Sequence, residues 1–90
     1  MVKIGKYDYQ KSTRKDKKLM TTVNNKIVHF GNPDYEHFFD KTRIWKELDH
    51  NDKKRRENYL KRSKGIKNKK GELTWKDPNS ANYHSIRILW

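Results

Sequence analysis

Two short runs in the first third of the chain have the composition of β-strands. Leu19 to Val23 (LMTTV) and Lys26 to Phe30 (KIVHF) are rich in β-branched and aromatic residues, which favour strands. Asn24 and Asn25 stand between them, and Asn tolerates the positive φ angles of a two-residue hairpin turn. The pattern predicts a β-hairpin over residues 19–30.

A third strand is expected before this hairpin. Met1 to Tyr9 alternates weakly, and Gly5 marks a bulge or a change of register. Lys11 to Lys18 is a polar link. Gly31-Asn32-Pro33 ends the sheet, because proline cannot continue a hydrogen-bonded ladder. We therefore expect a three-stranded antiparallel sheet over residues 2–30.

Aromatic residues concentrate in the segment that follows. Asp34 to Asp40 holds three of them in seven residues, and a single helical turn would point Tyr35, Phe38 and Phe39 inward. Packing in a core is a commoner role for such residues than stacking on bases. We interpret residues 34–48 as an aromatic connector.

A basic helix is predicted over residues 49–64. The stretch contains no Gly or Pro and is rich in Lys, Arg, Glu and Leu, which are good helix formers. Asp49 can serve as its N-cap and Gly65 as the residue that ends it. Tyr59 and Leu60 form a narrow apolar stripe, while cations cover the other side.

The boundaries and neighbours of this helix leave some alternatives open. The spacing of Ile44, Trp45 and Leu48 permits an earlier start, near Thr42. Asp52, Arg56 and Ser63 are expected on the same edge of the predicted helix as Tyr59 and Leu60.

The last third of the chain is expected to contain a loop and a final helix. Residues 65–78 form a basic loop, in which Asp77-Pro78 breaks the chain. Asn79 or Ser80 can cap a helix over residues 79–90, with Tyr83, Ile86 and Trp90 on one face. The alternation of Ile86, Ile88 and Trp90 would also suit a strand, but we favour the helix.

These elements predict one α+β domain: a small antiparallel β-sheet packed with a basic helix and a C-terminal helix. The chain has 90 residues, enough for one domain with a small core, and its three Trp, five Tyr and three Phe give that core weight. Dimerisation would help so small a core. The sequence contains no cysteine, which excludes disulfides and fits a reducing compartment. It has neither a signal peptide nor a transmembrane run, so we expect a soluble protein that is not secreted.

Positive charge concentrates in one block. Lys53 to Lys70 holds ten Lys or Arg residues and one acid, which is +9 of the chain's net charge of +12. Charge runs on helices are usually solvated faces of mixed sign, but here the signs are not mixed. A polyanion is therefore the expected partner.

The sequence gives little support to catalysis, cofactors or metal binding. It has no Gly-rich phosphate loop, zinc-finger spacing or nucleophile motif. Its histidines, His29, His37, His50 and His84, form no close metal-binding pair. The acidic group of Asp34, Glu36 and Asp40 around His37 could serve a nuclease, but charge balance against the basic helix is the commoner role. We expect no enzyme activity, no small-molecule substrate and no membrane binding.

Contacts with phosphates need no special spacing, so the candidate nucleic-acid-binding residues are the clustered cations. On the helix they are Lys53, Lys54, Arg55, Lys61, Arg62 and Lys64. A flexible flank adds Lys67, Lys69 and Lys70, and a second patch consists of Arg14, Lys15, Lys17 and Lys18. Trp75 is the best candidate for stacking on a base, while Trp45 and Trp90 are expected in the core.

Five segments of the chain form a characteristic series: RKDKK at 14–18, KIVHFG at 26–31, DHNDKKRRENYLKR at 49–62, KDPNSANYHS at 76–85 and the terminal LW. Together they resemble a family of small basic proteins encoded by giant DNA viruses of the mimivirus, marseillevirus and phycodnavirus type. The resemblance covers most of the chain and carries no catalytic residue. It implies a virion-associated protein located beside the genome, in the virion interior and in the viral factory or host nucleus.

The sequence thus favours a non-enzymatic protein that binds the phosphate backbone of double-stranded DNA with little sequence preference and helps to compact or package a viral genome. The alternatives are a structural virion protein that docks on an acidic protein partner and an RNA-binding protein.

Overall fold

A computed structural model describes all 90 residues and shows an α+β fold. Its strands are β1 (Val2–Ile4), β2 (Tyr7–Lys11), β3 (Leu19–Val23) and β4 (Lys26–Phe30). Its α-helices are α1 (Lys53–Ser63) and α2 (Ala81–Ile88), and the short 3-10 helices η1 (Lys46–Leu48) and η2 (Thr74–Lys76) precede them. Both α-helices are too short and too polar to cross a bilayer.

The sheet has four strands rather than the expected three, in the antiparallel order β1-β2-β3-β4. Gly5 causes the difference, because its φ of +64° lets the chain reverse and pair Ile4 with Tyr7. The expected bulge is therefore a full turn. The hairpin of β3 and β4 is confirmed at the expected residues, and Asn24 and Asn25 have φ angles of 49° and 67°.

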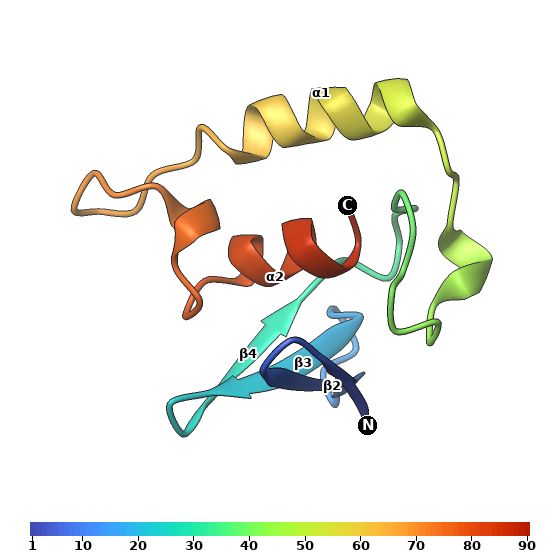
Figure 1. Cartoon of the computed structure of the whole chain (residues 1–90), viewed down its shortest axis with the longest axis horizontal. Coiled ribbons are helices and arrows are strands. Elements are labelled where there is room, and N and C mark those ends of the chain that lie inside the picture. The colour runs from blue at the N-terminus through green and yellow to red at the C-terminus, as the bar shows by residue number, and fades with distance from the viewer.

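The structure has three layers, with α2 lying between the sheet and α1 (Figure 1). The core forms where α2 meets the sheet. Its buried residues are Tyr9, Leu19, Phe30, Ile88 and Leu89. Trp45 and Trp90, which were expected to fill the core, lie at its edge, where they pack against this cluster while remaining partly exposed.

The helical interpretation of the C-terminal segment is confirmed, and α2 begins after Ser80. The Ser80 side chain caps it by accepting a hydrogen bond from the Asn82 amide. His84 then links α2 to its surroundings, since Nδ1 accepts from the Tyr9 hydroxyl at 2.8 Å and Nε2 donates to the Pro78 carbonyl at 2.7 Å. Burial lowers the pKa of His84, which favours this neutral form.

The N-terminus of the basic helix differs from the expectation. Asp52 caps it, because its carboxylate accepts from the amides of Lys54 and Arg55. Asp49 is not the cap, since it lies outside the helix and binds other groups. An earlier start near Thr42 is also wrong, because that stretch contains turns and η1 instead.

The helical turn expected over residues 34–40 is absent from the connector before α1. Phe39 and Lys41 instead donate their amides to the carbonyls of Leu89 and Ile88, at 3.1 Å and 3.0 Å, at the end of α2. The expected inward aromatic cluster is largely wrong, because Tyr35 is 68% exposed and Phe39 is 38% exposed. Hydrogen bonding to the open end of α2 determines this path.

Two substitutions of the same kind test where the core lies. Ile88→Ala removes a fully buried side chain from the α2 contact, and we expect it to reduce the free energy of unfolding by about 2–5 kcal/mol. Ile27→Ala is its control, because Ile27 is 61% exposed on β4, and a change of at most about 0.5 kcal/mol is expected. Urea unfolding measures both. Equal losses would contradict this assignment of the core.

Candidate nucleic-acid interface

The helix α1 presents cations on three of its sides. Lys54 and Lys61 lie seven residues apart and point away from the protein, on the side opposite the buried Ser63. Arg55 and Arg62, also seven residues apart, occupy one flank. Lys53 and Lys64 occupy the other. All six candidate residues of this region are exposed.

The remaining side of α1 holds the helix in place. The Tyr59 ring stacks on the Trp90 ring, with centroids 4.0 Å apart and planes 7° from parallel. Arg56 Nε donates to the main-chain oxygen of Trp90 at 2.7 Å, and the Ser63 carbonyl accepts from the Asn82 side chain at 2.7 Å. The narrow apolar stripe predicted from the sequence is therefore the side of α1 that packs against α2 and Trp90.

The basic block continues into an ordered turn. Lys67, Lys69 and Lys70 are all exposed. The Asn68 side chain accepts from the amides of Lys70 and Glu72 at 2.8 Å and 3.0 Å, so the expected flexible flank contains a hydrogen-bonded turn.

Trp75, the predicted stacking residue, is already covered by cations. Its ring is half-buried, with Lys64 Nζ 5.1 Å and Lys76 Nζ 5.4 Å from the centroid. Cation–π attraction of this kind fixes the two lysines near the ring. The structure thus gives Trp75 a role in positioning Lys64.

The second predicted patch lies on the loop between β2 and β3. Arg14 and Lys15 are exposed and Lys17 is half-buried. Together with Lys11, whose Nζ lies 5.2 Å from the Trp45 ring centroid, they line a cavity of about 200 Å³. This patch belongs to the sheet, whereas the first belongs to α1.

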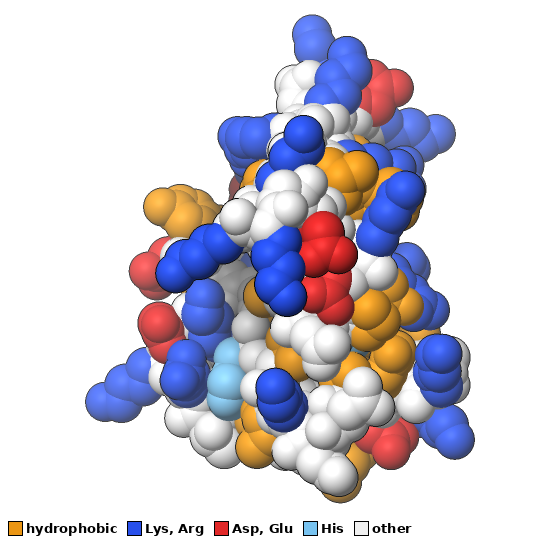
Figure 2. Space-filling view, turned by 90° about the vertical axis from the view of Figure 1, so that its left-hand side faces the viewer, with side chains coloured by type: hydrophobic (Ala, Val, Ile, Leu, Met, Phe, Trp, Pro, Cys, Tyr) orange, Lys and Arg blue, Asp and Glu red, His pale blue; other side chains and the backbone are white.

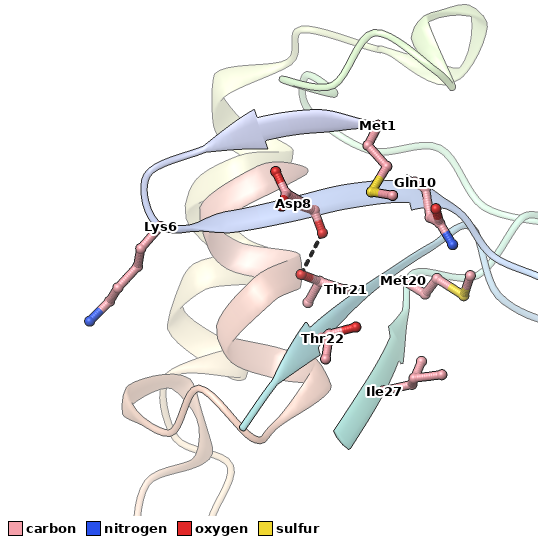
Figure 3. A pocket seen from close by; sticks show the side chains of 8 residues that line it. All are labelled: Met1, Lys6, Asp8, Gln10, Met20, Thr21, Thr22 and Ile27. Carbon is pink, nitrogen blue, oxygen red and sulfur yellow. Dashed lines mark hydrogen bonds between the residues drawn. The ribbon is translucent and has the colours of Figure 1, made fainter. Parts of the chain in front are cut away.

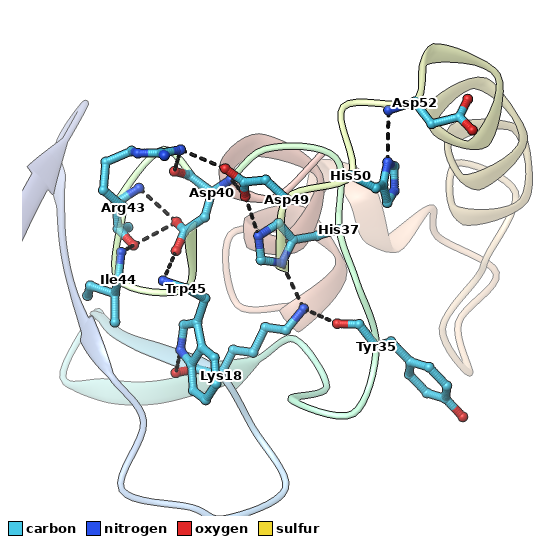
Figure 4. Close-up of polar contacts among 11 residues, drawn as sticks. Lys18, Tyr35, His37, Asp40, Arg43, Ile44, Trp45, Asp49, His50 and Asp52 are labelled. Carbon is cyan, nitrogen blue, oxygen red and sulfur yellow. Dashed lines mark hydrogen bonds and ion pairs between the residues drawn. The ribbon is translucent and has the colours of Figure 1, made fainter. Parts of the chain in front are cut away.

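Lys18, the fourth residue predicted for this patch, is not a surface residue. It is only 2% exposed. Its Nζ donates to the Tyr35 carbonyl at 2.6 Å and to His37 Nδ1 at 2.8 Å (Figure 4). Burial lowers the pKa of the Lys18 ammonium to about 8, against the attraction of the Asp40 and Asp49 carboxylates. Lys18 is therefore unavailable to DNA.

His37 extends this contact into a buried polar chain. Since Nδ1 accepts from the ammonium, Nε2 carries the proton and donates to Asp49 Oδ1 at 2.6 Å. The other carboxylate oxygen of Asp49 pairs with Arg43 at 2.7 Å. Burial, followed by the positive charge of Lys18, lowers the pKa of His37 and keeps the imidazole neutral.

The acidic group around His37 is dispersed by the fold. The buried Asp40 carboxylate accepts from Thr42 and from the Trp45 amide, which makes it a local cap. Glu36 pairs with Arg55 at 3.0 Å on the surface, as expected for charge balance against the basic helix. No group of three or more acidic or histidine side chains is placed to hold a metal ion.

The sheet face turned away from α2 carries a further cavity of about 330 Å³ (Figure 3). Its charged lining consists of Lys6 and Asp8, which balance each other. Thr21 donates to the Asp8 carbonyl at 2.7 Å within it. Figure 2 shows Lys and Arg side chains gathered toward the α1 end of the molecule, with others scattered over its opposite end.

Comparison of the chain with family models, curated proteins and solved structures finds no match in any of the three.

Substitution of Lys18 tests its buried position through the pH dependence of stability. Unfolding returns the pKa of Lys18 from about 8 to its ordinary value of 10.5. The unfolded chain therefore holds more protons between these values, and the free energy of unfolding should rise from pH 8 to about 10. In Lys18→Met this contribution should be absent. The loss of two hydrogen bonds should also destabilise the variant by about 1–3 kcal/mol at pH 7.

Urea unfolding at several pH values measures this effect. Lys15→Met removes an exposed cation of the same loop and should keep the alkaline rise of the unmodified protein. If the free energy of unfolding of Lys18→Met rises with pH as much as that of the unmodified protein, the Lys18 ammonium is solvated.

Proposed function

We propose that this protein binds double-stranded DNA through the phosphate backbone, without enzyme activity and with little sequence preference. One observation carries the proposal: of the ten Lys and Arg residues from Lys53 to Lys70, only Arg55 forms an ion pair with an Asp or Glu side chain. Unpaired cations on one rigid helix are costly because they repel one another, and phosphates remove that cost.

The geometry favours backbone contact over base reading. Cations project from three sides of α1, so they suit a curved row of phosphates more than the edges of a few bases. Neutralising about 6–10 phosphates would release counterions, and affinity would fall by about 10³–10⁵ between 50 and 200 mM salt. Binding of this type depends on duplex length and hardly on sequence.

The second patch supports a role in compaction. Arg14, Lys15 and Lys17 lie on the sheet layer, and α1 forms the outer helical layer on the far side of α2. Two cationic clusters on separate layers could contact two duplexes, and such bridging is what compaction requires beyond coating. The resemblance to small basic proteins of giant DNA viruses favours a viral genome as the DNA, with the protein packaged beside it.

A pair of charge reversals tests this interface. Lys54→Glu/Lys61→Glu changes the outward side of α1, and the slope of log affinity against log salt should decrease by about two units because two phosphate contacts are lost. Fluorescence anisotropy with random-sequence duplexes across salt measures the slope.

The matched control is Lys3→Glu/Lys26→Glu, which changes net charge by the same amount on exposed sheet residues. It should retain the original slope apart from a weak long-range effect. If the salt slope decreases equally in the two variants, net charge alone, and no defined face, attracts the DNA.

A further inference from the structure

A cavity of about 340 Å³ opens beside the cationic face of α1. Three aromatic rings line it, those of Tyr35, Tyr59 and Trp90, and two guanidinium groups, those of Arg55 and Arg62. Glu36 and Asn58 add polar edges. The volume lies at the low end of the range for small-ligand sites, which suits one nucleotide unit.

Tyr35 presents an aromatic ring that the protein does not bury. The ring is 68% exposed and points away from the polar cluster around Lys18 (Figure 4). Its main chain is nevertheless firmly held, because the carbonyl accepts from Lys18 Nζ at 2.6 Å and the amide donates to the Asn32 carbonyl at 3.1 Å. Because the backbone is already fixed, stacking of a planar ligand on this ring orders only the side chain.

The opposite wall of the cavity is preorganised in the same way. Tyr59 and Trp90 already stack on each other, 4.0 Å apart. Arg56 fixes the main-chain oxygen of Trp90 at 2.7 Å, and the Arg62 guanidinium lies 5.9 Å from the Tyr59 ring centroid. Flat aromatic surfaces beside arginines are the common means of holding unstacked bases.

The charges around the cavity select an anionic ligand. Arg55 and Arg62 lie on the same flank of α1, and both are exposed. Glu36 binds Arg55 at 3.0 Å across the rim, but both side chains are about half exposed, so a phosphate can compete for the guanidinium. The amide of Asn58 can hydrogen-bond to the edge of a base.

We propose that this cavity binds one unpaired base of a DNA single strand, stacked on Tyr35, with the adjoining phosphates on Arg55 and Arg62. The inference rests on the proposed function, because the rest of the same strand would follow the cations of α1. It adds a preference for strands with exposed bases, which phosphate contacts alone cannot provide.

The test compares two single-stranded oligonucleotides of about eight nucleotides, a length within the usual site sizes. One is oligothymidine, and the other has the same phosphates but abasic sugars. The unmodified protein should bind the first about tenfold more tightly in fluorescence anisotropy, since stacking of one base contributes roughly 5- to 150-fold in affinity. Tyr35→Ala should remove the difference, and Tyr35→Trp should retain it.

The control variant is Phe39→Ala, which truncates another exposed ring outside this cavity and should leave the preference intact. Equal affinity of the unmodified protein for the two oligonucleotides, or binding to neither, overturns the inference. A retained preference in Tyr35→Ala does so as well. A separate titration with fully paired duplex reports on backbone binding, so failure of the proposed function is recognised independently.

Discussion

Lys18 is buried, and its amide, carbonyl and ammonium groups are all hydrogen-bonded. Lys18 uses its amide to bind the carbonyls of Phe30 and Gly31, its carbonyl to accept from the Trp45 indole at 2.8 Å, and its ammonium to bind the connector near His37. It therefore joins the end of the sheet to the segment that leads into α1. The fit is close, since a Cβ on Gly31 would lie 3.1 Å from the Cβ of Lys18. A buried ammonium is costly to desolvate, and these hydrogen bonds offset the cost.

This contact matters for function because α1 cannot stand alone. The helix has eleven residues, fewer than an isolated helix needs in water, and its cations repel one another. The fold fixes it at both ends. At the start, His37 and the chain before α1 exchange main-chain hydrogen bonds, with His50 donating to the His37 carbonyl at 2.8 Å. At the end, Asn82 of α2 binds the Ser63 carbonyl. The rest of the fold thus keeps α1 helical, whereas the isolated segment would unfold.

Features governed by local chemistry were predictable from the sequence. The turn at Asn24 and Asn25 and the cap at Ser80 depend only on neighbouring residues. Features governed by distant partners were not. The expected N-cap, Asp49, is the right residue type, but its contacts with His37 and Arg43 keep it out of that role. Lys18 stands in a run of cations that reads as surface, and its partners lie 17 and 19 residues away. The cavity beside Tyr35 joins three distant segments and has no local signature.

If α1 is the DNA-binding surface, chemical-shift mapping by NMR should locate a bound duplex on it. A short random-sequence duplex would be titrated into isotope-labelled protein at low salt. We predict that the shifting amides belong to residues 53–64 and 67–70, with smaller changes at residues 14–17, while the outer sheet face around Ile27 stays unchanged. Changes centred on that outer face, or an absence of changes along α1, would contradict the account.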